Sequence, residues 1–534
     1  MPFTQVPFFY RRSSIVLLAA LILAGCVVGP DYKRPDAAVP ASYKEAAEGW
    51  KVAQPADRQD RGDWWAIYND AQLNDLEARL NASNQNIAQF AAAYRQARAL
   101  VSEARAAYFP TIGTSASASR SGTGSRPNST QFNSSSVSNS FGLGLDASWE
   151  PDLWGTVTRT VGAQRAGEQS AAADLANERL SMQGTLAQTY FQLRTLDAQQ
   201  KLLDDTVTAY QRTLQLTQNQ YAQGTVARSD VIQAQTQLQS AQAAAVDNGV
   251  ARAQYEHAIA VLVGEPPSTF SLAASPLDAT PPAVPAAMPS AILERRPDVA
   301  SAERKAAAAN EQIGVEIAAF FPTLTLSASG GFQSSVLSQL LRAPSRVWTV
   351  GPDLAATLFD GGLRSARTEA ARASYDQAVA TYRQAVLTAF QDVEDNLASL
   401  RILGTEVGIQ QQAVASAQQA LEIVKNEYKS GTVDFATVLI AQTTAFTAQQ
   451  KLATIAGQRM VSSVGLVKAL GGGWDVTQMD RETGTAAAPV PASGADGTVG
   501  AAVSRTSAVV AADAAAKTDK PSAVVATDPA AKTE

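Results

Sequence analysis

The chain has 534 residues, of which 17% are charged, and a net charge of −6. This balance gives no reason to expect the basic surface that nucleic-acid binding requires, so we expect no nucleic acid as a partner. One cysteine and one histidine exclude a cysteine-based metal cluster and a disulfide framework. A catalytic triad would depend on His257, which lies in a helical run. We expect this side chain to be solvated or interfacial, and the chain not to be an enzyme.

The first residues have the features of an export signal. Arg11 and Arg12 form a basic start, and residues 15–24 form an apolar run too short to span a membrane comfortably. The run ends in Leu-Ala-Gly before Cys26, as in a bacterial lipobox. We therefore expect residues 1–25 to be a lipoprotein signal peptide and Cys26 to carry a covalent lipid, with no other cofactor. A plain signal peptide with a chance cysteine is the alternative.

The residue after the cysteine is valine and not aspartate. The inner-membrane retention signal of enteric bacteria is therefore absent, and we expect sorting to the outer membrane. A proline-rich stretch through Pro55 follows, and residues 26–69 are expected to form an extended, lipid-anchored segment.

Long stretches of the chain lack proline, for example residues 152–265 and 353–488. Because proline costs about 3 kcal/mol inside a helix, these stretches permit very long helices. We expect helices at about 70–107, 155–220, 226–263, 298–319, 363–428 and 434–470. A helix of roughly 65 residues is on the order of 100 Å long. Such helices exceed a single globular core and suit a coiled coil or an α-helical tube.

Four shorter segments alternate apolar with small or polar residues: Thr111–Arg120, Phe141–Trp149, Thr323–Phe332 and Trp348–Phe359. About ten residues with period two is the length of a transmembrane β-strand. One such segment would also fit a soluble sheet, but four in an exported lipoprotein favour membrane strands. Four strands cannot close a barrel, and an open edge is not tolerated in lipid. We therefore expect a homotrimer with about twelve strands.

Two phrases occur twice, roughly 200 residues apart, which indicates a duplicated half and not a short solenoid repeat. Ala107–Thr111 returns as Ala319–Thr323, and Tyr221–Val226 returns as Tyr428–Val433. The glycine in each of the latter phrases interrupts a helical pattern, so each phrase predicts a helix–turn–helix tip.

These patterns define the expected domain organisation. After the signal peptide and the segment 26–69 come a first repeat at 70–263, a linker at 264–297, a second repeat at 298–470 and a tail at 471–534. The tail is rich in alanine, threonine and proline, and beyond its first residues we expect it to be disordered.

Several phrases follow one another in a fixed order. They are Cys26–Pro35, Trp64-Trp65 with Leu73-Asn74, Arg295–Val299 with Ala302–Arg304, Ala319–Pro322 and Leu358–Gly362. In this order they resemble the outer membrane efflux proteins, a TolC-like family, and within it the NodT-type efflux lipoproteins. The resemblance covers about residues 26–473.

The resemblance implies an α+β membrane protein of three protomers. A 12-stranded transmembrane β-barrel, with four strands from each protomer, would continue into a long periplasmic α-helical barrel. A mixed equatorial region would be built from 27–69, 264–297 and the chain after 470.

The function it implies is a passive exit duct for drugs, solvents or metal ions. The duct would stand in the outer membrane of a Gram-negative bacterium and reach into the periplasm. Its partners would be outer membrane lipid, a periplasmic adaptor (membrane fusion) protein and an inner-membrane pump of the resistance-nodulation-division (RND) type.

In the family the gate lies at the periplasmic tips. Asp230, six positions after Gly224, matches an acid that bonds across to the next coil, and Tyr428 matches its tyrosine partner. Asp434 matches a pore-facing aspartate, and a ring of like charges at a constriction selects cations. The alternative is that Asp230 and Asp434 are N-caps or first-turn acids of their helices, positions at which the helix dipole favours a negative charge.

The turns themselves are expected to contact the adaptor through Gly224, Thr225, Val226, Gly431, Thr432 and Val433. The chain departs from the family pattern at Val433, where some relatives have arginine, and at Ile440, where many have aspartate. A second acidic ring is therefore left open, and Arg228 or Lys429 is an alternative member of the latch.

Two other functions remain open at this point. A channel for type I protein secretion would have the same fold and a different load. A structural coiled-coil lipoprotein would have no pore, although the alternating strands argue against it.

Overall fold

The computed structural model describes residues 27–40, 43–45, 63–123, 136–277, 280–282 and 295–473. The expected signal peptide, Cys26 and residues 474–534 of the tail lie outside the described residues, as do parts of the segments 26–69 and 264–297. Among the helices that the structure describes, none is both long enough and apolar enough to cross a membrane.

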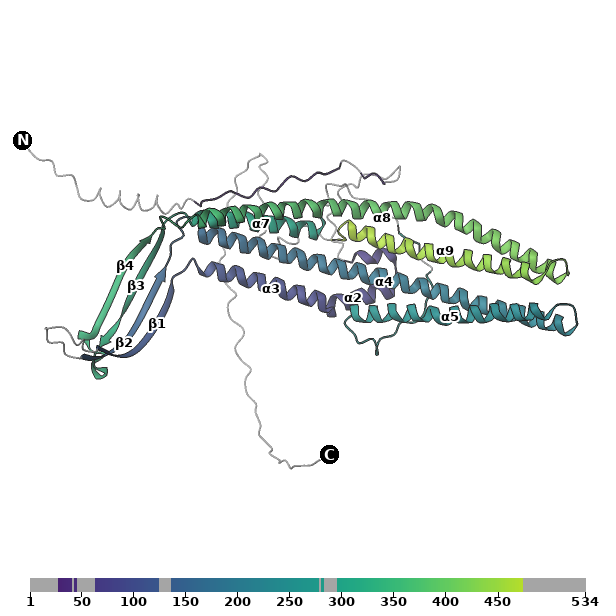
Figure 1. The fold of residues 1–534 in the computed structure, drawn as a ribbon, viewed down its shortest axis with the longest axis horizontal. Helices are drawn as coiled ribbons and strands as arrows, with labels where there is room; N and C mark the ends of the chain where they lie inside the picture. The colour runs from purple at the N-terminus through teal and green to yellow at the C-terminus, as the bar shows by residue number, and fades with distance from the viewer. Residues whose placement is uncertain are drawn as a thin grey trace, which may run out of the picture. The chain divides into compact units, whose positions relative to one another are not determined.

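Each half of the duplicated chain has one long helix with two shorter helices along it, and the first half adds a further short helix, α2 (Ala71–Ser83). Figure 1 shows this arrangement in both halves. The first half has α3 (Gln85–Ala106), α4 (Thr156–Ala222) and α5 (Arg228–Leu262), and the second has α7 (Pro297–Ala318), α8 (Leu363–Lys429) and α9 (Phe435–Ala469). The two long helices, α4 and α8, have 67 residues each. In each half both shorter helices pack on the long one, and α4 also contacts α7 and α9.

The shorter helices of each half meet end to end. The Asn84 side-chain amide donates to the Leu262 carbonyl at 2.7 Å, where α5 ends and α3 begins. In the second half the Arg296 guanidinium donates to the Ala469 carbonyl at 3.3 Å, where α9 ends and α7 begins. Each pair of short helices therefore lies along one long helix, and the duplication seen in the sequence is a duplication of packing.

The predicted helix at 70–107 is wrong as a single element. It consists of α2 (Ala71–Ser83) and α3, separated at Asn84, which has an extended backbone. The Asn84 side-chain oxygen accepts a hydrogen bond from the Ile87 amide at 3.0 Å, so asparagine caps a new helix instead of continuing the old one. The other predicted helices are confirmed to within a few residues at each end.

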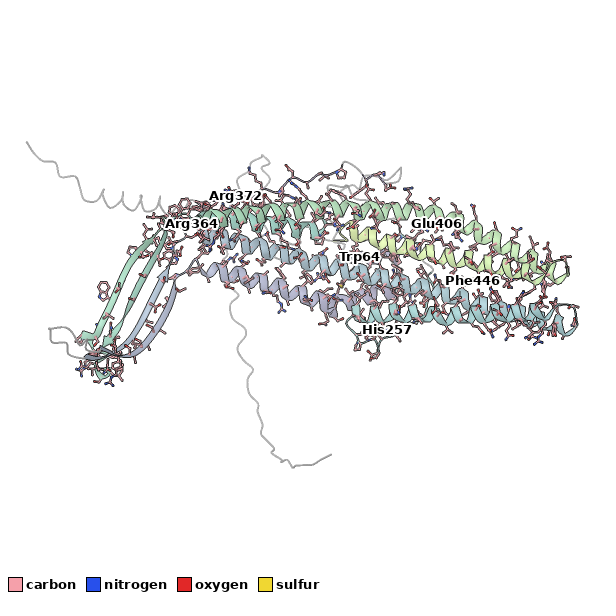
Figure 2. The ribbon with its side chains drawn as sticks, in the orientation of Figure 1. Trp64, His257, Arg364, Arg372, Glu406 and Phe446 are labelled. Carbon is pink, nitrogen blue, oxygen red and sulfur yellow. The ribbon has the colours of Figure 1, made fainter. Side chains whose placement is uncertain are left out.

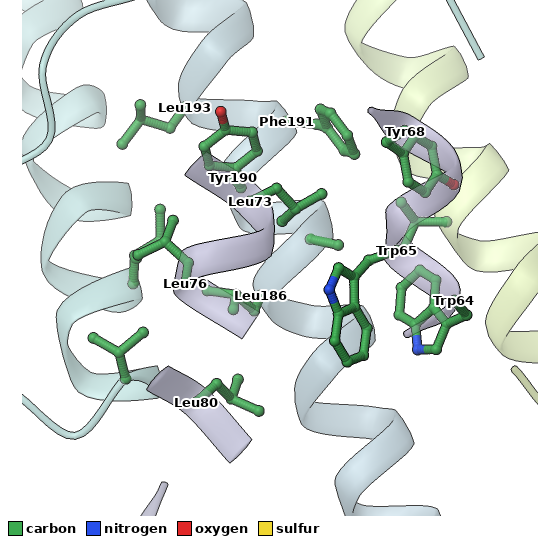
Figure 3. Close-up of a cluster of buried hydrophobic side chains, with 14 of the residues drawn as sticks. Trp64, Trp65, Tyr68, Leu73, Leu76, Leu80, Leu186, Tyr190, Phe191 and Leu193 are labelled. Carbon is green, nitrogen blue, oxygen red and sulfur yellow. The ribbon is translucent and has the colours of Figure 1, made fainter. Parts of the chain in front are cut away.

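The largest core lies against the middle of α4 (Figure 3). A short 3₁₀ helix, η1 (Trp64–Tyr68), and α2 pack there on α4. The buried side chains include Trp64, Trp65, Tyr68, Leu73, Leu76, Leu80, Leu186, Tyr190, Phe191 and Leu193. The Trp64 indole N–H donates to the Gln183 side chain at 3.1 Å, so the polar group of this buried tryptophan has a hydrogen-bond partner inside the core.

Four antiparallel strands form one sheet in the order β1-β2-β3-β4 (Figure 1). They are β1 (Thr111–Thr123), β2 (Ser136–Trp149), β3 (Thr323–Ser334) and β4 (Arg346–Ala355). The predicted end of the fourth strand at Phe359 is wrong. Ala355 pairs with Thr323, the first residue of β3, and the residue before Thr323 is Pro322. Proline has no N–H for a ladder, so β4 has no partner beyond this point.

The sheet has one apolar face and one small, polar face. Ala147 lies opposite Ala328, which lies opposite Val350, so these residues share a face. The large side chains of that face include Ile112, Leu143, Leu145, Trp149, Leu326, Trp348, Val350 and Leu354, and all of these are exposed. The other face carries mainly Gly, Ser, Thr and Asp.

Candidate functional site

The two repeated glycine phrases form the turns between α4 and α5 and between α8 and α9. Gly224 and Gly431 have φ of 73° and 75°, a region that glycine occupies without steric cost. The residue after each glycine donates its amide to the carbonyl five positions earlier in the preceding helix: Thr225 to Gln220 and Thr432 to Glu427, both at 3.0 Å. This is the Schellman arrangement. Because α4 begins soon after β2, the first turn lies about 100 Å of helix away from the sheet.

The turns expose part of their surface. Gly224, Thr225, Gly431 and Thr432 are exposed, while Val226 and Val433 are half-buried. A Cβ added at either glycine would meet no atom within 4 Å, so only the backbone conformation requires glycine there. Of the six residues predicted to contact the adaptor, these four are therefore exposed to solvent in a single protomer.

An apolar tip cluster lies just inside the two turns. Its buried members are Ala234, Tyr428, Phe435 and Val438, and its half-buried members are Leu214, Val226, Val424 and Val433. These residues come from α4, α5, α8, α9 and both turns, so the cluster ties one helical hairpin to the other. Sequence reasoning missed this cluster. The only signal was Phe435 and Val438, spaced one helical turn apart after the second glycine phrase.

Tyr428 belongs to the tip cluster through its ring, which lies 5.8 Å from the ring of Phe435. Its hydroxyl is buried and makes no hydrogen bond to any residue that the structure describes. The nearby Thr217 hydroxyl donates to the Thr213 carbonyl at 3.0 Å. Burial raises the pKa of the Tyr428 hydroxyl, the Thr217 side chain opposes this rise, and the negative charge of Asp230 adds to it. Within one protomer Asp230 thus influences Tyr428 only through its charge, and no hydrogen bond joins the two residues.

Asp230 lies in the first turn of α5, where an acid is favoured by the helix dipole. Its carboxylate accepts a hydrogen bond from the Ser229 hydroxyl at 3.2 Å. The residue at the start of α5, Ala227, offers no side-chain cap. Asp230 is half-buried.

Asp434 is the N-cap of α9. Its carboxylate accepts hydrogen bonds from the Thr437 amide at 3.0 Å and from the Thr437 hydroxyl at 2.5 Å. The hydroxyl bond, together with the amide bond, lowers the pKa of Asp434, so this carboxyl is ionised at neutral pH. The side chain is exposed. The capping alternative is therefore confirmed for Asp434, and the cap holds a fixed negative charge at the second tip.

A buried charge network was not predicted. Arg194 and Asp197 on α4 have only 3% and 1% of their side chains exposed, and they form an ion pair at 2.8 Å. Arg252 on α5 reaches the same aspartate at 2.8 Å and donates to the Leu272 carbonyl at 2.7 Å. The network fixes the chain after α5 onto the helices. The three-residue spacing of Arg194 and Asp197 does not predict a buried pair, because Glu422 and Lys425 have the same spacing and form a more exposed pair.

The only histidine, His257, is exposed on α5 (Figure 2). In the described ranges, no three His, Cys, Asp or Glu side chains are grouped so that they could hold a metal ion.

Comparison with known proteins identifies related chains. Residues 77–265 and 288–472 match the family model for the outer membrane efflux proteins. The chain is 32% identical to SrpC, a solvent efflux pump outer membrane protein of Pseudomonas putida, over 88% of this chain and 100% of the relative. It is 29% identical to CusC, a cation efflux system protein of Escherichia coli, over 85% of this chain and 97% of the relative.

A solved structure has the same fold. The outer-membrane channel OprN superposes with a TM-score of 0.77 at 30% sequence identity, and the match covers 84% of this chain and 100% of OprN.

Proposed function

This chain belongs to the outer membrane efflux protein family, and from that premise we propose that three copies form one closed channel that serves as a passive exit duct. The channel stands in the outer membrane of a Gram-negative bacterium and extends into the periplasm.

The edges of the sheet carry the proposal. Within the described residues β1 pairs only with β2, and β4 pairs only with β3, so each outer strand has an unpaired edge. An unpaired edge is not tolerated in lipid. Pairing β4 of each protomer with β1 of the next closes the sheet, and three protomers supply about twelve strands. The apolar face then meets lipid and the small, polar face lines the duct.

The helices offer matching edges. On α8, Ile402, Ile409 and Ile423 are 54%, 64% and 50% exposed at intervals of whole heptads, which is the spacing of a coiled-coil seam. On α5, Val246, Val250 and Val261 are 79%, 57% and 64% exposed. Since these isoleucines of α8 and valines of α5 are exposed in the protomer, we infer that α8 of one copy packs on α5 of the next and continues the tube.

The tips form the gate and the docking surface in this proposal. Three copies of Asp434 place a ring of negative charge at the periplasmic mouth, which favours cations. Asp230 and Tyr428 form the latch. The turns Gly224–Val226 and Gly431–Val433 meet the periplasmic adaptor, which links the duct to an inner-membrane pump of the RND type.

We also propose that residues 1–25 are removed and that Cys26 is acylated, which anchors the mature chain in outer membrane lipid. Around the helices, the chain near η1, the segment 270–277 and residues 295–297 and 470–473 form the equatorial region.

The cargo is proposed from the relatives alone. SrpC is a solvent efflux protein and CusC a cation efflux protein. We propose that this duct passes drugs, solvents or metal ions, and that the inner-membrane pump selects among them.

The test is conduction by the full-length protein purified in detergent. The expected result is a trimer that resists dissociation on an unheated gel and produces discrete conductance steps in planar bilayers. The same preparation after heat denaturation is the control. A monomer, or a trimer without conductance steps, would overturn the proposal.

A further inference from the structure

The first described residues after Cys26 are held by many contacts where the helices meet the sheet. The Val28 amide donates to the Trp154 carbonyl at 3.1 Å. The Asn310 side chain of α7 donates to the Pro30 carbonyl at 3.0 Å. The Tyr32 hydroxyl donates to the Glu303 carboxylate of α7 at 2.6 Å. Residues 27–32 therefore have a defined place on the helices and are not a free tether.

Arg159, near the start of α4, makes three further contacts to this segment. Its side chain is only 6% exposed. The guanidinium donates to the Val28 carbonyl at 3.1 Å, to the Gly29 carbonyl at 3.2 Å and to the Asp31 carboxylate at 3.3 Å. Its remaining terminal nitrogen pairs with Glu311 of α7 at 3.0 Å. The arginine guanidinium is planar and has five N–H donors, so this one side chain can bind a backbone segment and a second helix at once.

Two glycines allow residues 27–31 to lie close against the backbone of the helices. Gly29 has a φ of +102°, and a Cβ built there would lie 2.6 Å from the Cα of Gly314 on α7. Gly155, just before α4, has a φ of +84°, and its Cβ would lie 2.8 Å from the Val27 side chain. No larger residue fits at either glycine without moving the segment.

The same place is connected to the sheet. The Trp154 ring stacks on Phe321 with centroids 4.8 Å apart, and its indole donates to the Pro322 carbonyl at 2.7 Å. Pro322 directly precedes β3. Around this connection Phe109, Phe320 and Phe359 are 70%, 46% and 88% exposed. Exposed aromatic side chains at one level are typical of a membrane–water interface.

We propose that Arg159 is a positioning residue for the membrane anchor: it fixes residues 27–31 so that the acyl group on Cys26 enters the membrane beside the ends of the strands, and it thereby couples acylation to insertion of the sheet. This inference rests on the proposed acylation of Cys26. Successive Cα atoms are about 3.8 Å apart, so a lipid on residue 26 starts next to the clamped Val27. An unclamped lipid would still bind a membrane, but it would not bring the sheet to it.

A double-mutant cycle separates this role from a structural one. Arg159→Met is made in the full acylated protein and in a form in which Cys26 is Ser and a general cleavable signal peptide replaces residues 1–25. The measured quantity is the fraction recovered from outer membranes as heat-resistant trimer, and incorporation of labelled palmitate checks acylation. We expect Arg159→Met to leave palmitate labelling intact and to lower the trimer by about tenfold in the acylated form only, a coupling typical of groups that act together. Arg165→Met, at an exposed arginine of the same helix, is the matched control and should change neither form.

A second variant distinguishes the proposed role of Arg159 from simple misfolding. Gly29→Ala displaces the segment and leaves the Arg159–Glu311 pair intact, so it should give the same loss in the acylated form only. Gly167→Ala on α4, where an added Cβ meets nothing within 4 Å, should have no effect. An equal loss in both forms, or no loss in the acylated form, would overturn the role of Arg159 while leaving the channel proposal intact. A wild-type chain that takes up no palmitate would overturn both the inference and the proposed acylation.

Discussion

The Asp197 carboxylate on α4 accepts a hydrogen bond from the Arg252 guanidinium on α5 at 2.8 Å, in a site from which water is almost excluded. The same carboxylate accepts from Arg194 at 2.8 Å and from the Ser275 amide at 3.0 Å. Two arginines and one aspartate thus hold the segment after α5 against two helices. A buried ion pair adds little stability over an apolar pair, but breaking it is costly because a charge is left buried.

Asp197→Asn should therefore destabilise the protein strongly. It removes the negative charge and leaves the buried Arg194 without its ionic partner, which costs about 3–5 kcal/mol. Thermal unfolding of the detergent-purified protein measures the effect as a lower melting temperature. Asp205→Asn is the control, because its pair with Lys201 is on the same helix and is 72% exposed on the aspartate side. That change should cost less than about 1 kcal/mol, and equal shifts for both variants would contradict the prediction.

Glu77 should make stability depend on pH. It lies on α2 with 0% exposure, and neither carboxyl oxygen has a hydrogen-bond partner in the described part of the chain. Burial raises the pKa of this carboxyl from 4.5 to about 9. Between these pH values the folded state keeps a proton that the unfolded state has lost, so stability falls as pH rises and is then constant above the folded pKa. The loss at pH 7 is about 3 kcal/mol.

Glu77→Leu should remove this dependence. The melting temperature of the variant should exceed that of the wild type at pH 8, and the difference should shrink toward pH 5. Unfolding is followed by circular dichroism at several pH values. Glu103→Leu, at an exposed position of α3, controls for the change of residue type. A wild-type protein whose stability is constant from pH 5 to pH 9 would show that Glu77 is not buried as a neutral acid.

Asp434 should set ion selectivity. Asp434→Asn removes the charge but keeps an oxygen that caps α9, since asparagine and aspartate are equally good N-caps. We expect the reversal potential of the trimer in a salt gradient across a planar bilayer to show weaker cation selectivity, with an unchanged melting temperature. Asp205→Asn, on the exposed surface of α4, should leave selectivity as it is. Unchanged selectivity of the Asp434 variant would remove this residue from the pore.

Asp230 and Tyr428 should act as one latch. Asp230→Asn and Tyr428→Phe each remove one partner of the proposed latch, so each should raise the conductance of the trimer. If they form one latch, the double variant should conduct no more than the more conductive single variant, which is the non-additivity of groups that interact. Tyr428→Phe keeps the ring in the tip cluster, so the cluster remains packed. Independent, additive increases would show that the two residues act on different contacts.

Much of the fold could be predicted from local patterns. The proline-free stretches and the glycine phrases placed the long helices and both turns, because proline and glycine act on the backbone of their own segment. Alternation likewise placed the four strands. Three boundaries failed: at Asn84, after Ala355, and before Phe141, where β2 already begins at Ser136 opposite Thr123. At Asn84 a side chain caps a new helix, and after Ala355 the partner strand has not yet begun, so each depends on what a residue contacts.

The candidate site was predictable only in part. The turn glycines were found from the repeat, Asp434 was singled out by the family resemblance, and its capping role was foreseen as an alternative. The tip cluster around Phe435 and the contacts of Arg159 with residues 28–31 were not predicted. Arg159, Arg194 and Glu77 look like ordinary charged residues of polar helices in the sequence, and only burial distinguishes them.

The sequence by itself determined the duplicated plan of helices, strands and turns, because helix breaking, turn formation and strand alternation depend on residues a few positions apart. The tertiary structure decided which charges are buried, which strand edges are left open and where residues 27–32 are held. These properties depend on segments that are distant in the chain, such as Val28 beside Trp154 or Asp197 beside Arg252, and on how much water their packing excludes.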